Sequence, residues 1–273
     1  MMTRSVDIRL KEIAGNHTGR VSFLIFLISY CLFYAAEAKA QFSCGMSGAL
    51  NSPTATLPQD GTFSLGGNYL PSQMMPADLK YNSGNYFLNI AFFSFMELSY
   101  RSTFLRCESL HPLKHKYTWN KDRSVAVKFR LFPEGKTWRP ALAIGSNDVV
   151  TTNNVIRLTN DSKGNRYFAS IYGVLTKTIP INRQKIELSA GYYIPFYDHS
   201  NYKGIFGSAA WRPGGAEWLS VWGEYDSNAV NLGVRACLFR HFELQVFCYD
   251  FKAVSGGIRY SLNLLGRRTK CGH

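Results

Sequence analysis

The sequence has few charged residues and lacks the cysteine and glycine patterns of metal and nucleotide sites. Charged residues make up 18% of its 273 residues and aromatic residues 15%. This balance suits strands and membrane interfaces better than a solvated helical protein. No CxxC pair, Cys/His cluster or GxGxxG loop is present, so neither a zinc site nor a phosphate-binding loop is predicted. We expect no metal, no cofactor and no catalytic residue.

Long basic runs are also missing. Lysine and arginine number 31 against 18 acidic residues, for a formal net charge of +13, yet no run of five or more basic residues occurs. A positive protein favours anionic partners such as lipid headgroups or acidic polysaccharide. Scattered charge argues against nucleic acid as a partner, and it also fits basic residues that only keep loops soluble.

The one long apolar stretch lies near the start of the sequence. Residues 21–36 are uncharged, follow Arg20 and precede an Ala38-Lys39-Ala40 site. At 16 residues the stretch is short for a spanning helix, which needs about 20. We predict a signal peptide over residues 1–40, cleaved between Ala40 and Gln41. An uncleaved anchor is one alternative and a lipidated Cys44 another, although "QFSC" lacks the usual leucine three residues before the cysteine.

Five cysteines follow the predicted leader, and their odd number and irregular spacing do not form a disulfide framework. Cys237 and Cys248 are the nearest couple. The strand pattern described next puts them on opposite faces of the sheet, which disfavours a bridge between them.

Apolar and polar residues alternate along the chain beyond residue 61. In "SVAVKFRL", Val125 and Val127 take one face while Ser124 and Lys128 take the other, and "AVNLGVRACL" repeats the pattern. Strict alternation predicts strands with one apolar face. Most of the segments have nine to twelve residues, close to the 9–11 that cross a bilayer at a tilt. The twelve predicted strands are 61–70, 85–93, 94–105, 122–132, 137–146, 166–177, 183–194, 204–212, 216–226, 228–239, 241–249 and 253–264.

The predicted connections support a membrane barrel. Long connections around 71–84, 106–121 and 147–165 alternate with short ones at Phe93-Ser94, 133–136 and 178–182. Outer-membrane barrels pair long outer loops with short periplasmic turns in this way. We therefore predict an all-β fold, a transmembrane antiparallel up-and-down barrel of about twelve strands with both ends in the periplasm.

The polar face of these strands predicts a mixed-charge barrel interior. A barrel of this size is largely filled by side chains, so paired charges inside are more often stabilising struts than a binding site. The candidate lumen network consists of Glu97, Arg101, Lys128, Arg130, Glu187, Glu224, Arg235, Glu243 and Arg259.

Three blocks of sequence resemble the YjbH-like family of outer-membrane proteins. "GALNSPTATLPQDGTFSLG" is similar to the family's entry segment, "SVAVKFRLFPEGKTWRPALAIGSNDV" to a family hairpin and "WGEYDSNAVNLGVR" to a later turn and strand. The resemblance implies a barrel linked to export or surface deposition of exopolysaccharide, without an established catalytic activity. The motif residues that it marks are Asn51, Pro53, Thr54, Ala55, Asp60 and Gly61.

Together these patterns predict a signal peptide (1–40), a periplasmic lead-in segment (41–60), the barrel (61–265) and a C-terminal tail (266–273). The lead-in is expected either at the barrel mouth or as an ordinary turn without a partner. We expect a non-enzymatic protein of the Gram-negative outer membrane that assists exopolysaccharide export or envelope organisation. Its expected partners are outer-membrane lipid and either anionic polysaccharide or a periplasmic export protein. A barrel hydrolase with His199 as base, and a small diffusion pore, are the alternatives.

Overall fold

The computed structural model describes residues 43–75, 81–108, 117–151, 168–196 and 200–267. These residues form twelve strands and one short 3-10 helix, η1 (Ser72–Met74). The strands are β1 (Thr62–Leu70), β2 (Ser83–Phe92), β3 (Met96–Glu108), β4 (Tyr117–Phe132), β5 (Ala141–Thr151), β6 (Ser170–Ile181), β7 (Gln184–Pro195), β8 (Gly204–Arg212), β9 (Leu219–Tyr225), β10 (Val230–Leu238), β11 (Phe242–Tyr249) and β12 (Ala253–Asn263).

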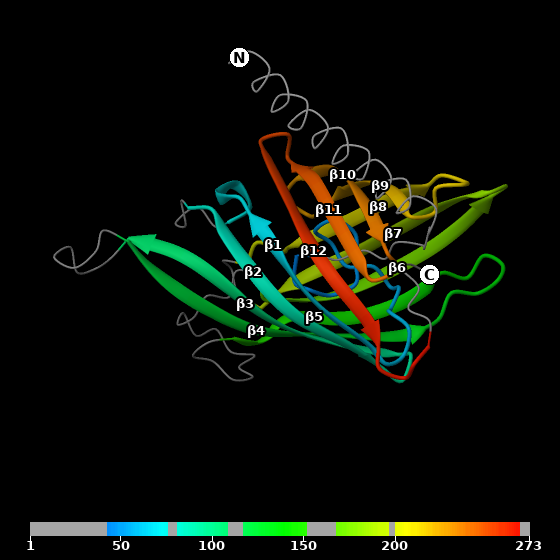
Figure 1. Ribbon diagram of the computed structural model, residues 1–273, viewed down its shortest axis with the longest axis horizontal. Helices are drawn as coiled ribbons and strands as arrows, with labels where there is room; N and C mark the ends of the chain where they lie inside the picture. Colours follow the sequence, from blue (N-terminus) through cyan, green and yellow to red (C-terminus); the bar gives the residue numbers. More distant parts are fainter. Residues whose placement is uncertain (1–42, 76–80, 109–116, 152–167, 197–199, 268–273) are drawn as a thin grey trace, which may run out of the picture.

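The twelve strands close into a single antiparallel barrel (Figure 1). Each strand pairs with its neighbours in sequence, and β12 pairs with β1 from Thr62 opposite Asn263 to Tyr69 opposite Gly256. Closure removes the sheet edges, so the backbone groups are paired where lipid offers them no partner. The predicted up-and-down barrel is confirmed.

The alternation in sequence becomes an apolar exterior and a polar interior. On β10, Val230, Leu232 and Val234 are 45–48% exposed, whereas the neighbouring residues Asn231 and Arg235 are fully buried. Successive side chains of a strand point to opposite faces, and in a closed barrel those faces are the outside and the lumen. The exposed side of the barrel is therefore the one that lipid can cover.

Some strand bounds differ from the prediction. β3 ends at Glu108 rather than at residue 105, and β4 begins at Tyr117 rather than at residue 122. β5 begins at Ala141 rather than at residue 137. Pro140 has no N–H for a ladder and holds the preceding residue in an extended conformation. The connection 133–140 is instead closed by Gly135 N–H, which donates to the Arg139 carbonyl at 2.9 Å.

The two ends of the barrel carry different connections. At the end where β1 begins and β12 ends, β2 meets β3 and β10 meets β11 in tight turns, with positive φ at Phe93, Ser94, Phe239 and Arg240. We call this the short-connection end. At the opposite end, residues 71–82 and 109–116 separate β1 from β2 and β3 from β4. Short connections of outer-membrane barrels face the periplasm, which is the orientation that the sequence predicts for this end.

Candidate functional site: the filled lumen

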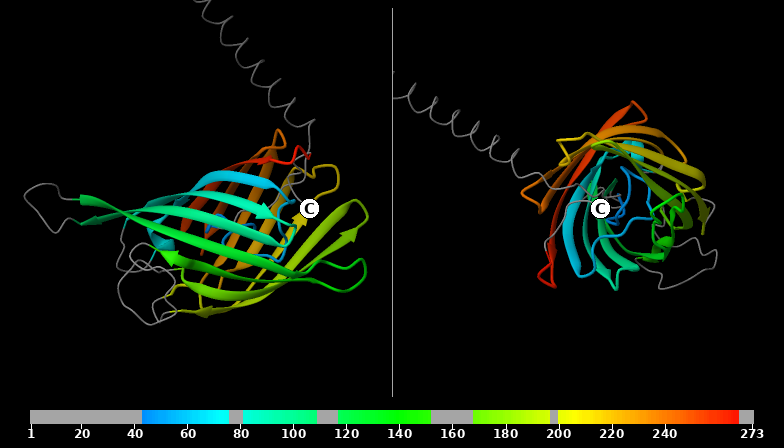
Figure 2. Two further views of the ribbon diagram at one scale, coloured as in Figure 1. Left: turned by 90° about the horizontal axis from the view of Figure 1, so that it is seen from below. Right: turned by 90° about the vertical axis from the view of Figure 1, so that its right-hand side faces the viewer.

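Residues 43–57 lie inside the barrel. Figure 2 (right) looks along the barrel and shows this blue segment within the ring of strands. Every residue from 43 to 55 is buried, and Met46, Ala49, Leu50 and Ala55 are 0% exposed. We call residues 43–57 the lumen segment. The lead-in was expected at the barrel mouth or without a partner, and the structure instead packs it along the interior, where the polar wall supplies partners for its backbone.

A tight reversal shapes the lumen segment. Gly48 and Pro53 form an isolated antiparallel bridge, and Ala49 N–H donates to the Ser52 carbonyl at 2.6 Å. The reversal leaves the N–H groups of the residues at its tip without partners in the segment itself. Buried backbone groups need such partners, and the barrel wall provides them.

Glu224 of β9 caps this reversal. Its carboxylate oxygens accept the backbone N–H groups of Leu50 at 3.0 Å, Asn51 at 2.7 Å and Ser52 at 3.2 Å. Hydrogen bonds to an ionised acceptor are stronger than neutral ones. The Asn51 side chain adds a bond from Nδ2 to Asp226 Oδ2 at 2.6 Å. Asn51 of the predicted motif is thus fixed to the wall by both its backbone and its side chain.

β10 and β11 hold the carbonyl groups of the same reversal. Arg235 Nη2 donates to the Ala49 carbonyl at 2.8 Å, and Gln245 Nε2 donates to the Leu50 carbonyl at 3.0 Å. The Arg235 guanidinium also stacks over the Trp222 ring, 4.5 Å from its centroid. The wall therefore offers hydrogen-bond donors to the carbonyl groups of the reversal and an acceptor carboxylate to its N–H groups.

A buried ion pair holds the segment nearer the short-connection end. Lys128 Nζ lies 2.9 Å from Glu97 Oε2, and neither side chain is exposed. Glu97 accepts the Ser47 N–H at 2.6 Å, while Lys128 donates to the carbonyls of Ser47 at 2.6 Å and Thr54 at 3.2 Å. The segment and Asn89 of β2, which donates to Glu97 at 2.9 Å, satisfy the remaining hydrogen bonds of the pair. Buried charges are tolerated under this condition.

Cys44 lies against β3 inside the barrel. Its Sγ accepts a hydrogen bond from Arg101 Nη1 at 3.0 Å, its carbonyl accepts one from Ser99, and the residue is 1% exposed. Burial raises the pKa of the Cys44 thiol to about 12. Arg101 in turn pairs with Asp148 at 2.7 Å. A lipid anchor on this sulfur would have to leave the lumen, so the structure argues against lipidation of Cys44.

The predicted polar residues divide into three groups. Glu97, Arg101, Lys128, Glu224 and Arg235 contact the lumen segment, as described above. Glu187 pairs with Arg212, and Glu243 lies between Arg235 and Arg259, within the barrel wall. Arg130 is half-buried at the strand end and donates to the Ser94 carbonyl, outside these clusters.

The remaining motif residues lie along the path into β1. Thr54 and Ala55 are fully buried, and Ala55 N–H donates to Thr176 Oγ1 at 2.8 Å. The Asp60 carbonyl accepts from Asn263, and Gly61, with φ of +76°, donates its N–H to the Ala91 carbonyl. Asp60 and Gly61 therefore shape the entry to the first strand rather than a ligand site. Ala40, Gln41 and His199 lie outside the described residues.

Several partners of the lumen segment were not predicted. They are the small or neutral side chains Asn85, Ser99, Thr176 and Gln245. All four occupy inward positions of the alternating strand pattern, which is the signal that identifies them. Their pairing with residues 43–57 depends on how the segment folds inside the barrel, and alternation carries no information about that.

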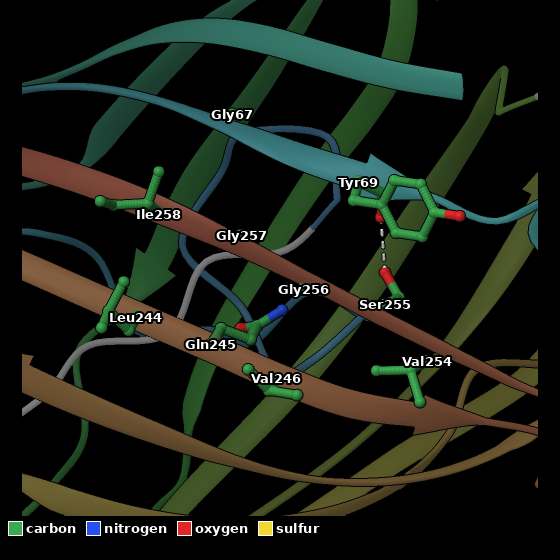
Figure 3. A pocket seen from close by; sticks show the side chains of 10 residues that line it. All are labelled: Gly67, Tyr69, Leu244, Gln245, Val246, Val254, Ser255, Gly256, Gly257 and Ile258. Atoms are coloured by element: carbon green, nitrogen blue, oxygen red, sulfur yellow. Dashed lines mark hydrogen bonds between the residues drawn. The ribbon is translucent and has the colours of Figure 1, made fainter. Parts of the chain in front are cut away.

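The outer face has a shallow groove of about 800 Å³ across β11, β12 and β1 (Figure 3). Gly67 and Gly256 lie among its lining residues, and Tyr69, Val246 and Ile258 stand beside them. A Cβ on Gly256 would come within 2.5 Å of the Gln245 carbonyl oxygen, so the close approach requires glycine there. The groove is lined by uncharged residues and faces lipid, so it offers no charged group for chemistry.

The described part of the chain contains neither a group of three or more His, Cys, Asp or Glu side chains that could hold a metal ion nor a helix that is long and apolar enough to cross a membrane. Cys248 is a free thiol, and Cys237 is buried on the opposite face. The lumen is therefore the site with the densest polar chemistry in these residues.

Two solved structures are similar to this chain at low identity. Outer membrane phospholipase A from Escherichia coli is similar at 11% identity and a TM-score of 0.33, covering 76% of this chain and 93% of that one. An outer membrane channel of the COG4313 group from Pseudomonas putida F1 is similar at 11% identity and a TM-score of 0.37, covering 76% and 96%. No curated protein sequence matches.

A family model described as "Exopolysaccharide biosynthesis protein YbjH" matches residues 40–209, which is more than half of the chain. The match takes in the lumen segment and the strands β1 to β7. A closed barrel with an apolar exterior belongs in the outer membrane of Gram-negative bacteria, and the protein is a member of the YjbH family of exopolysaccharide biosynthesis proteins.

Proposed function

We propose that the protein is a non-enzymatic outer-membrane barrel that assists exopolysaccharide export or envelope organisation with its lumen closed. The observation that carries this proposal is the lumen segment. Side chains from β2, β3, β4, β6, β9, β10 and β11 hydrogen-bond to it. A segment held from so many strands behaves as part of the barrel core.

The filled lumen indicates how such a barrel would act. A hydrated polymer cannot share the interior with residues 43–57 while those residues keep their bonds to the wall. The protein would therefore work at its two ends, by contacting the polymer or a periplasmic export protein. The formal net charge of +13 favours an anionic polysaccharide as the polymer.

The organisation of the charged residues supports a structural role for the lumen. Glu224 caps backbone N–H groups, and Glu97, Glu187 and Glu243 pair with basic side chains. Carboxylates that are committed in this way stabilise a fold. A general acid or base needs access to a substrate proton, and these groups are buried under the lumen segment or within the wall.

A deletion strain tests the proposed function. We expect it to carry less surface polysaccharide, or to become more sensitive to detergents, and the full-length gene to restore both properties. Wild-type polysaccharide and unchanged envelope integrity in the deletion strain would contradict the proposal. Complementation with Glu224→Gln, beside the exposed-site control Glu217→Gln, asks whether the anchored lumen segment is needed for the phenotype.

A further inference from the structure

A bulge in β5 turns two consecutive side chains into the lumen, toward the end of the barrel opposite the short-connection end. There β5 places residues 147–149 opposite the single Ala126 of β4, and Asp148 has a φ of +51°. Neighbouring residues of a regular strand face opposite sides, yet Asn147 and Asp148 are both buried, at 0% and 3% exposure. Bulges re-aim side chains next to functional sites, so this distortion of the wall marks a candidate site.

Polar side chains of two neighbouring strands lie beside this bulge. Thr103 of β3 is directly opposite Asp122 of β4 in the strand register. Thr151 joins Asp122 to β5, because its Oγ1 donates to Asp122 Oδ1 at 2.8 Å. Arg101 joins Asp148 to β3 in the same way, with Nη2 at 2.7 Å from Asp148 Oδ1. The strands β3, β4 and β5 therefore present these side chains to one part of the lumen.

Three oxygen atoms of this cluster are buried without a hydrogen bond. Thr103 Oγ1, Asn147 Oδ1 and Asp148 Oδ2 have no hydrogen-bond partner among the described residues. The three side chains are no more than 3% exposed. Buried polar atoms in native proteins are nearly always satisfied, and an ordered water or a bound ion supplies the contact where no protein group does. All three atoms can act as acceptors, so a cation would satisfy them together.

The charges around these oxygens favour a cation over a neutral water molecule. Asp122 and Asp148 are close enough for their like charges to act on each other, and Arg101 acts on both. Arg101 is shared further, since its Nη1 donates to Cys44 Sγ. One guanidinium thus serves two carboxylates, and the negative charge left over lies in a buried part of the wall, where an uncompensated ion is costly.

We propose that Thr103, Asp122, Asn147 and Asp148, here called the bulge site, bind a Ca²⁺ ion. Ca²⁺ prefers oxygen ligands and accepts them in a less regular arrangement than Mg²⁺, with water completing its shell. Two carboxylates beside one arginine give the site a low ligand charge, so we expect a dissociation constant of about 10⁻⁴–10⁻³ M. The ligands come from three strands and form no local motif, which is why the sequence predicted no metal.

Bound Ca²⁺ would tie β3, β4 and β5 together at the bulge. The same ion would hold the Asp148 carboxylate against Arg101, which contacts Cys44 of the lumen segment. This inference goes beyond the proposed function, since it concerns a ligand of the barrel wall and no contact with polysaccharide.

Calcium binding by the purified protein tests the bulge site. The protein is refolded in a non-ionic detergent, so that no lipopolysaccharide competes for Ca²⁺, and equilibrium dialysis against radioactive Ca²⁺ measures saturation. We expect the wild type to bind one Ca²⁺ per chain. Asp122→Asn should bind at least about 10-fold more weakly, the smallest usual effect of losing even an outer-shell partner of a metal. The matched control Asp250→Asn, which removes a surface carboxylate paired with Lys252, should bind like the wild type.

Urea titration gives a second readout, after heat-modifiable gel migration has shown that each variant is folded. Millimolar Ca²⁺ should raise the urea midpoint of the wild type and of Asp250→Asn, but not that of Asp122→Asn. Thr103→Val removes a neutral oxygen only, so it serves where Asp122→Asn does not fold, and it should also weaken binding.

Three results would overturn the proposal. The first is a folded wild type without saturable Ca²⁺ binding at millimolar concentration, the result expected of a cluster that holds only water. The second is wild-type affinity in the folded Asp122→Asn or Thr103→Val variant. The third is displacement of the bound Ca²⁺ by an equal concentration of Mg²⁺, which would contradict a site of the Ca²⁺ type. Both readouts use purified protein, so they are independent of any polysaccharide phenotype.

Discussion

Lys128 Nζ lies 2.9 Å from Glu97 Oε2 in the barrel interior, and Ser47 of the lumen segment bonds to both residues. The pair connects β3 to β4 at one level of the wall and holds the segment at the same point. Removing one member leaves a buried charge without its counterion, which costs about 3–5 kcal/mol in soluble proteins. We expect a similar cost for an unpaired charge inside a barrel that lipid surrounds.

We therefore expect Lys128→Met to lower the free energy of unfolding by about 3–5 kcal/mol. Urea titration in detergent micelles, followed by heat-modifiable migration, measures the change. The double variant Glu97→Gln/Lys128→Met should recover part of the loss, because it removes the isolated carboxylate. Lys252→Met breaks the exposed pair with Asp250 and should change stability by less than about 1 kcal/mol. An equal effect of Lys128→Met and Lys252→Met would contradict this reading of the interior pair.

Glu224→Gln tests the cap on the reversal of the lumen segment. Glutamine has one acceptor oxygen, and its amide group would meet N–H donors that the carboxylate now accepts. Loss of charge-assisted bonds of about 1.5–3 kcal/mol should accelerate amide exchange at Leu50, Asn51 and Ser52 by roughly 10- to 150-fold. Hydrogen–deuterium exchange of the folded protein measures this. Glu217→Gln, at an exposed position, should leave the exchange of those amides unchanged. Equal exchange in both variants would contradict the proposed cap by Glu224.

A comparison of Gly45 with Gly204 tests whether close packing requires glycine at position 45. Gly45 and Gly204 both have positive φ, +80° and +91°, so alanine is strained at either position. A Cβ on Gly45 would also lie 2.6 Å from Phe87 Cβ, whereas no atom lies within 4 Å of a Cβ on Gly204. Gly45→Ala should therefore destabilise the fold by about 1–3 kcal/mol more than Gly204→Ala, the range for overpacking. Equal urea midpoints for the two variants would show that residue 45 is not packed as described.

The barrel itself could be predicted because alternation is a local signal. The alternation of Val230, Asn231 and Leu232 shows which side of β10 faces lipid, and the same pattern along the chain predicts the number of strands. Strand ends were less accurate where a local feature overrides propensity, as at Pro140 before β5. The inward position of Glu97 and Lys128 also follows from alternation, and their pairing follows from the register that places one opposite the other.

The contents of the lumen could not be predicted in the same way. Residues 43–57 have neither a strand nor a helix period, and their fold depends on contacts with side chains that lie up to 195 positions away, as between Leu50 and Gln245. The family resemblance marked Asn51 and Pro53 as motif residues, and Pro53 does lie in the reversal. Glu224, the partner of Asn51, was predicted as a lumen residue, but nothing local connects Glu224 to Asn51. Such pairings between the lumen segment and distant wall residues can be identified only in the folded barrel.

Cys44 offers a chemical probe of the same segment. Burial raises its thiol pKa to about 12, so at every pH between 7 and 9 the folded protein should react with maleimide at this residue far more slowly than the protein in urea. In urea the rate should rise about tenfold per pH unit below the ordinary thiol pKa of about 8.5. Since the folded state favours the neutral thiol, the free energy of unfolding should fall as pH rises above that ordinary value. Mass spectrometry of peptides separates Cys44 from the other cysteines, and ready labelling of Cys44 in the folded barrel would mean that the lumen segment leaves its place.

Conductance measures whether the lumen segment closes the barrel. The wall around it carries Arg101, Lys128, Arg235 and their carboxylate partners, which water would solvate if the segment were gone. Wild-type protein in planar bilayers should therefore show little ionic current, and a variant lacking residues 43–57 should show steady openings. That deletion also removes the partners of Lys128 and Glu224, so Glu224→Gln serves as the milder variant. We expect Glu224→Gln to give brief openings of an otherwise closed barrel and the control Glu217→Gln to remain closed. Steady current through the wild type would mean that the lumen conducts with its segment in place, and the proposal of a protein that acts only at its ends would then fail.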